Sequence, residues 1–110
     1  MANFRNMTLV WNIYRGTSFG GDLEFNQGTE DGPDYDLTGM TVVVTIGDTV
    51  YRSGVAPQLT VPVPTNGVAQ FRLADADTAA MTEPRYPLTV DIDNGGGSTT
   101  RYWDGVVYMA

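Results

Sequence analysis

The chain has 110 residues, the size of a single domain, and it contains neither Cys nor His. Disulfides, zinc–thiolate sites and His-based catalytic triads are therefore excluded, and we expect no enzymatic activity. Thirteen acidic residues against six basic ones, all of them Arg, give a net charge of −7. Because the arginines are spread from Arg5 to Arg101, a phosphate backbone would be repelled, and we expect no nucleic-acid binding.

The start of the chain differs from the remainder. We assign residues 1–6 to an N-terminal arm with Phe4 as a possible anchor, and residues 7–110 to a single β-sandwich domain. No apolar run reaches the roughly 20 residues of a membrane span, and no signal peptide is visible. We therefore expect no membrane partner and a chain that is made and folded in the cytoplasm.

Alternating apolar and polar residues predict short strands through most of the chain. They are expected at residues 7–14, 18–25, 40–46, 49–52, 58–63, 68–73, 86–93 and 99–109. Within the last of these, the alternation puts Tyr102 and Trp103 on opposite faces. Seven or eight short strands with frequent turns indicate a β-sandwich or a small barrel.

Proline marks one strand as an edge. Residues 58–63 alternate, but Pro62 lacks a backbone N–H, which restricts this segment to the edge of a sheet or to a strand end. An edge that resists strand addition is a possible docking surface. We therefore name Val61, Pro62 and Val63, together with Phe4, as candidate partner contacts.

One segment has a helical character. Residues 75–81 are rich in Ala, and Asp75 is placed to cap a short helix, while Asp77 adds negative charge near its N-terminus. A helix this short is not stable alone. It lies between two predicted strands, which indicates a crossover between two sheets.

Three groups of residues offer weak alternatives to a purely structural role. The loop from Glu30 to Asp36, which includes Asp31 and Asp34, has oxygen ligands of the kind that bind Ca²⁺, but it matches no defined motif. Asp91, Asp93 and Asn94 form a similar weak group. Aromatic residues that could line a sugar-binding face are equally suited to core filling: Trp11, Phe19, Phe25, Tyr102, Trp103 and Tyr108.

Five segments in a fixed order carry a family resemblance. They are Arg15-Gly16-Thr17-Ser18-Phe19, Asp36-Leu37-Thr38-Gly39, residues 74–81, residues 85–92 and residues 100–107. With them the chain resembles, over residues 8–109, the small immunoglobulin-like β-sandwich modules of tailed bacteriophages, akin to the N-terminal domain of baseplate upper proteins.

The resemblance implies an all-β, immunoglobulin-like β-sandwich of seven or eight strands with one short helical turn at a sheet crossover. It also implies a virion structural protein without catalytic residues, cofactor or metal, in a symmetric assembly with other virion proteins. Two positions in the particle stay open, the tail tip or baseplate, where it would attach a fibre, and the capsid, as a cement or decoration protein. The alternative is a carbohydrate-binding module that uses Trp11 or Trp103 with a Ca²⁺ site near Asp31 and Asp34.

Overall fold

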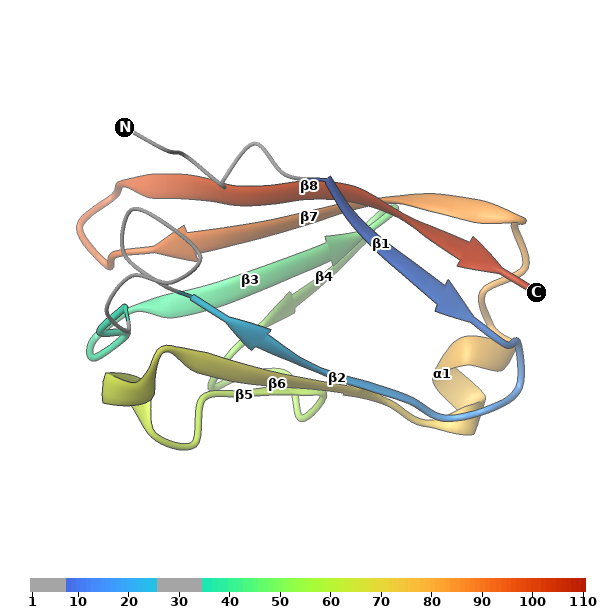
Figure 1. Cartoon of the computed structure of the whole chain (residues 1–110), viewed down its shortest axis with the longest axis horizontal. Coiled ribbons are helices and arrows are strands. Elements are labelled where there is room, and N and C mark those ends of the chain that lie inside the picture. The colour runs from blue at the N-terminus through green and yellow to red at the C-terminus, as the bar shows by residue number, and fades with distance from the viewer. Residues whose placement is uncertain (1–7, 26–34) are drawn as a thin grey trace.

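The computed structural model describes residues 8–25 and 35–110, and eight strands within these ranges form two facing sheets (Figure 1). The strands are β1 (Thr8–Ile13), β2 (Phe19–Glu24), β3 (Thr41–Ile46), β4 (Thr49–Arg52), β5 (Leu59–Thr60), β6 (Val68–Leu73), β7 (Arg85–Asp93) and β8 (Thr99–Met109). The helices are the 3-10 helix η2 (Pro64–Asn66) and the α-helix α1 (Asp75–Ala79). The predicted all-β sandwich with one short helix is confirmed.

The strand order explains where the chain changes sheets. One sheet has the order β1-β8-β7-β3-β4, with β1 parallel to β8, and the other has the order β2-β6-β5. The helix α1 connects β6 of the three-stranded sheet to β7 of the five-stranded sheet, so the predicted crossover is confirmed. The turn between β1 and β2 makes a second crossover, and Figure 1 places it beside α1.

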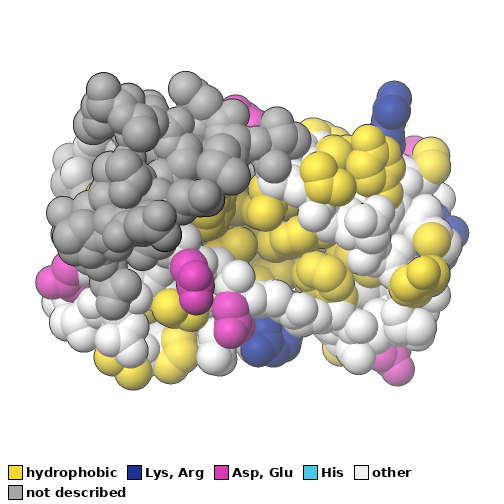
Figure 2. All heavy atoms as spheres, viewed as in Figure 1, with side chains coloured by type: hydrophobic (Ala, Val, Ile, Leu, Met, Phe, Trp, Pro, Cys, Tyr) yellow, Lys and Arg dark blue, Asp and Glu magenta, His cyan; other side chains and the backbone are white. Residues whose placement is uncertain are grey.

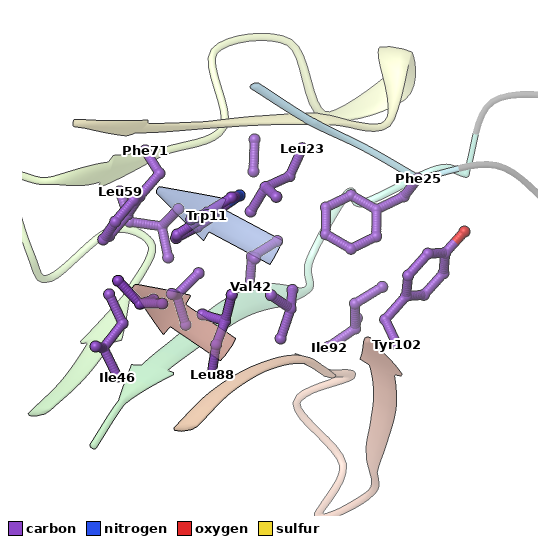
Figure 3. Close-up of a cluster of buried hydrophobic side chains, with 14 of the residues drawn as sticks. Trp11, Leu23, Phe25, Val42, Ile46, Leu59, Phe71, Leu88, Ile92 and Tyr102 are labelled. Carbon is purple, nitrogen blue, oxygen red and sulfur yellow. The ribbon is translucent and has the colours of Figure 1, made fainter. Parts of the chain in front are cut away.

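Aromatic side chains join the two sheets across the core (Figure 3). Phe71 of β6 is fully buried and stacks on Trp11 of β1, with 5.3 Å between ring centroids. It also meets Tyr51 of β4 edge-on at 5.2 Å. Burial of a side chain of this size contributes about 1.5–3 kcal/mol to the free energy of unfolding.

A β-bulge changes the alternation in β8. In the pairing of β7 with β8, Val90 lies opposite Trp103 and Asp91 lies opposite Arg101, which leaves Tyr102 as the extra residue. Tyr102 and Trp103 therefore both pack against Phe25, at centroid distances of 4.7 and 5.1 Å. The prediction that Tyr102 and Trp103 lie on opposite faces was wrong, because it assumed an uninterrupted strand.

The proline-containing strand is shorter than its alternation predicted. Only Leu59 and Thr60 pair with β6, and the chain then turns into η2. Pro62 and Pro64 cannot donate ladder hydrogen bonds, so pairing ends before them. The predicted edge position is confirmed, since β5 is the outer strand of the three-stranded sheet.

Gly105 permits the close parallel pairing of β1 with β8. It lies opposite Leu9, and a Cβ atom at position 105 would lie 1.8 Å from the carbonyl oxygen of Leu9. No side chain can be accommodated there without displacement of β1.

We therefore expect Gly105→Ala to lower the free energy of unfolding by about 2–3 kcal/mol, the cost of forced repacking. Gly21→Ala is the matched control, because a Cβ atom at that strand position meets no atom within 4 Å. Urea denaturation of both variants measures the difference, and equal stabilities would contradict the steric account.

Candidate functional site

The carboxylates of the five-stranded sheet are paired with arginines. Asp91 and Asp104 both accept hydrogen bonds from Arg101, the second at 3.0 Å, and Asp93 lies 3.6 Å from Arg52. The hydrogen bond that Arg101 donates to Asp91 is the main cause that raises the pKa of Arg101. Within residues 8–25 and 35–110, no three acidic side chains come together as a metal site.

The acidic loop is only partly in view. Glu30, Asp31 and Asp34 lie outside the described residues. Asp36 is exposed, and one of its carboxylate oxygens accepts a hydrogen bond from the N–H of Thr38 at 2.9 Å. Hydrogen bonds from the Thr38 side chain and then its backbone hold the pKa of Asp36 below its ordinary value.

The predicted contact residues have different environments. Phe4 lies outside the described residues. Val61 packs against the core, whereas Pro62 is exposed and Val63 is 49% exposed. The structure therefore places two of the named side chains on the surface beside the edge strand β5.

Most of the aromatic residues considered for a sugar-binding face are part of the core. Trp11, Phe25 and Tyr102 are buried, and Phe19 and Trp103 pack against the core cluster. Tyr108 is the exception, at 44% exposure. These residues do not form an exposed aromatic platform.

The outer face of the five-stranded sheet carries an apolar corner that sequence reasoning missed. Val10 of β1, Val106 of β8 and Pro87 of β7 lie side by side in register, and Tyr108 follows two positions along β8. Val10 is 47% exposed. We call these four residues the apolar corner. Hydrophobic side chains also gather over β1 in Figure 2. The sequence signal for this corner was Val10, an apolar residue at an outward-facing position of a strand with alternating side chains.

A cleft of about 280 Å³ lies between α1 and the β3–β4 hairpin. Its walls come from three separate segments, so no local motif could have revealed it. The hairpin contributes Ile46, Thr49 and Tyr51; α1 and the residues after it contribute Ala76, Asp77, Ala80 and Met81; and β7 contributes Tyr86.

The start of α1 is capped by a different residue from the one that the sequence indicated. Ala74 is the N-cap residue, and the carboxylate of Asp77 accepts a hydrogen bond from its N–H at 2.9 Å. Asp75 is the first helical residue and makes no side-chain cap. The prediction that Asp75 caps the helix was wrong. The N-cap position is one residue earlier, and the capping carboxylate belongs to Asp77, the third residue of the helix.

Thr78 and Arg15 fasten α1 to the β1–β2 turn. The Thr78 hydroxyl is fully buried, donates a hydrogen bond to the carbonyl of Thr17 at 2.7 Å and accepts one from the N–H of Gly16 at 3.0 Å. The guanidinium of Arg15 donates to the carbonyls of Met81 at 2.7 Å and Glu83 at 3.2 Å. These bonds fix the helical wall of the cleft.

The cleft has an acidic and aromatic character. Burial, and then the negative charge of Asp77, raise the pKa of the Tyr51 hydroxyl. Asp77 is the one charged side chain among the residues that line the cleft. The residues that line the cleft contain no His, Cys or Ser side chain.

We expect Thr78→Val to lower the free energy of unfolding by about 1–3 kcal/mol, because two part-buried hydrogen bonds of the Thr78 hydroxyl, to the Thr17 carbonyl and from the Gly16 N–H, would be lost. Thr60→Val, at an exposed position, is the control with the same change of side chain and is expected to be near neutral. Thermal unfolding measures both, and a neutral Thr78→Val would refute the anchoring role.

The carboxyl group of Asp36 is expected to make the stability of the fold depend on pH. Its pKa is lowered in the folded state, so its contribution to stability is present above the ordinary pKa of 3.8 and disappears as pH falls through the lowered value. A carboxyl NMR titration should give a midpoint below 3.8, and Thr38→Val should move it upward. A midpoint unaffected by Thr38→Val would argue against the side-chain hydrogen bond.

Comparison with known proteins identifies the fold alone. No protein-family model and no curated protein matches the chain. Among solved structures, it is similar to the N-terminal Ig1-2 module of the Drosophila receptor protein tyrosine phosphatase DLAR, with a TM-score of 0.52 and 14% identity. The match covers 91% of this chain and 44% of that one, so the chain spans less than half of the neighbour's length.

The helices of the described residues are all too short to cross a membrane.

The strand order agrees with this comparison. The three-stranded sheet β2-β6-β5 matches strands B, E and D of immunoglobulin domains, and β8-β7-β3-β4 matches strands G, F, C and C′. Near the start of β7, the hydroxyl of Tyr86 accepts a hydrogen bond from the N–H of Glu83 at 3.0 Å, as in the tyrosine corner of such domains. The described residues form an immunoglobulin-like β-sandwich.

Proposed function

We propose that the chain is a non-enzymatic structural subunit of a bacteriophage particle that acts through protein–protein contacts. The five ordered segments that resemble tailed-phage modules support this proposal, and the immunoglobulin-like sandwich is the fold that such modules require. The subunit resides at the tail tip or baseplate, where it attaches a fibre, or on the capsid as a cement or decoration protein. It is assembled in the host cytoplasm with other virion proteins in a symmetric arrangement.

The observation that carries the proposal is the apolar corner. Val10 and Tyr108 are 47% and 44% exposed, and the next row of the same face holds Asp104 and Thr89 beside them. Contiguous exposed apolar side chains with a polar rim are characteristic of protein–protein interfaces. Another structural protein of the particle is the partner that we assign to this corner.

The distribution of charged groups also favours binding over chemistry. Asp91, Asp93 and Asp104 are each engaged by an arginine, and the chain has no His or Cys to act as base or nucleophile. The carbohydrate-binding alternative gains no support from the described aromatic residues, since five of the six are in or against the core.

Mass spectrometry of purified particles tests the location. We expect the chain in virions of the phage or prophage that encodes it, in a copy number that matches a symmetric ring or lattice. If particles purified to constant composition lack the chain, the proposal fails.

The same particles test the surface. Val10→Glu places a charge in the apolar corner, opposite Val106, and should reduce incorporation at least several-fold, because burial of an unpaired charge is costly. Val55→Glu is the control, since Val55 is 81% exposed and lies outside the corner. Equal incorporation of both variants would exclude the corner as the contact surface.

A further inference from the structure

The cleft between α1 and the β3–β4 hairpin has room for a long side chain of a partner. Its volume of about 280 Å³ lies at the lower end of the range of about 300–1,000 Å³ that holds drug-sized ligands. Ile46 and Met81 supply apolar surface, and Tyr51 and Tyr86 supply aromatic rings. A long, slender side chain matches this combination of size and lining.

The charge of the cleft selects a cation. Asp77 lines it, and the charge of Asp77 reaches the Tyr51 hydroxyl. Asp48 is the sequence neighbour of Thr49, a lining residue, and adds negative charge. Among the arginines near lining residues, Arg52 and Arg85 stand one position away from Tyr51 and Tyr86 on alternating strands and so belong to the opposite face. The guanidinium of Arg15 also lies near the lining residue Met81, and it is engaged by the carbonyls of Met81 and Glu83.

We propose that this cleft receives a basic side chain, Lys or Arg, from a partner protein. Aromatic rings attract an ammonium or guanidinium group over their faces, and the carboxylate of Asp77 supplies the opposite charge. The apolar lining accepts the methylene groups of the same side chain. The net charge of −7 attracts a basic partner over a longer range.

This inference rests on the proposed function, because it names the chemistry of one contact in the particle. It is nevertheless testable on the isolated chain. If the chain were absent from particles, binding at the cleft would still stand; if the chain is in particles but fails the titration, only this inference is refuted.

The probes are the Nα-acetyl methylamides of arginine, lysine and norleucine, added to the ¹⁵N-labelled chain. We expect the two cationic probes to shift backbone NMR signals of residues 49–51 and 76–81 saturably, with weakening at higher salt. Norleucine, of similar length without charge, should not. Equal shifts with norleucine would show a merely apolar cleft, and no shifts with any probe would refute the site.

A charge-matched pair of variants tests Asp77. Asp77→Asn keeps an oxygen that can accept from the N–H of Ala74, and it should weaken binding of the arginine probe about two- to fivefold. Asp75→Asn removes the same charge from a residue that does not line the cleft, and it should leave affinity unchanged. Equal weakening by both would indicate diffuse attraction and would contradict the proposal.

A second pair remains informative if Asp77→Asn does not fold. Ala80 lines the cleft and Ala79 does not, and both are exposed. Ala80→Arg brings its own guanidinium to the cleft and should abolish binding of the probe. Ala79→Arg adds the same charge elsewhere on α1 and should largely preserve it. Undiminished binding by Ala80→Arg would place the probe outside the cleft.

Discussion

The buried hydroxyl of Thr78 joins the two points at which the chain passes between the sheets at one end of the sandwich. It bonds to the backbone of Gly16 and Thr17 in the β1–β2 turn, while its own helix carries the chain from β6 to β7. A five-residue helix has no independent stability, so its existence depends on this attachment and on Arg15. The position of one wall of the cleft follows from the same bonds.

Aromatic packing helps to hold the two sheets together in this chain without Cys, whereas antibody domains carry a disulfide between strands B and F. Phe71 lies between Trp11 and Tyr51, so it contacts the five-stranded sheet at both edge strands, β1 and β4. Close approach of β1 is possible because Gly105 has no side chain. The order of strands and the hydroxyl of Tyr86 preserve an immunoglobulin-like design in a chain without Cys.

The outer face of the five-stranded sheet has two parts, a charged part and the apolar corner. Across β4, β3 and β7, Arg52, Val43 and Asp91 form one row, and Val43 is only 7% exposed although it lies outside the core cluster. The ion pairs of this face, Arg52 with Asp93 and Arg101 with Asp91 and Asp104, lie at the surface and contribute little to stability, so their main effect is a hydrated, charged surface. The apolar corner lies on the same face, and the cleft lies at the hairpin edge. Both surfaces suit a protein that works through contacts.

The sequence by itself determined the fold class, most strand positions and the helical crossover, because the alternation of side chains and the Ala-rich segment are local signals. It also excluded His- and Cys-based chemistry. Local signals failed at Tyr102, where pairing between strands creates a bulge, and at Asp75, where Asp77 caps the helix instead. Only the tertiary structure decided the anchoring by Thr78, the apolar corner and the cleft. The physical reason is that each of them depends on residues far apart in the chain, whose approach is set by sheet pairing and packing.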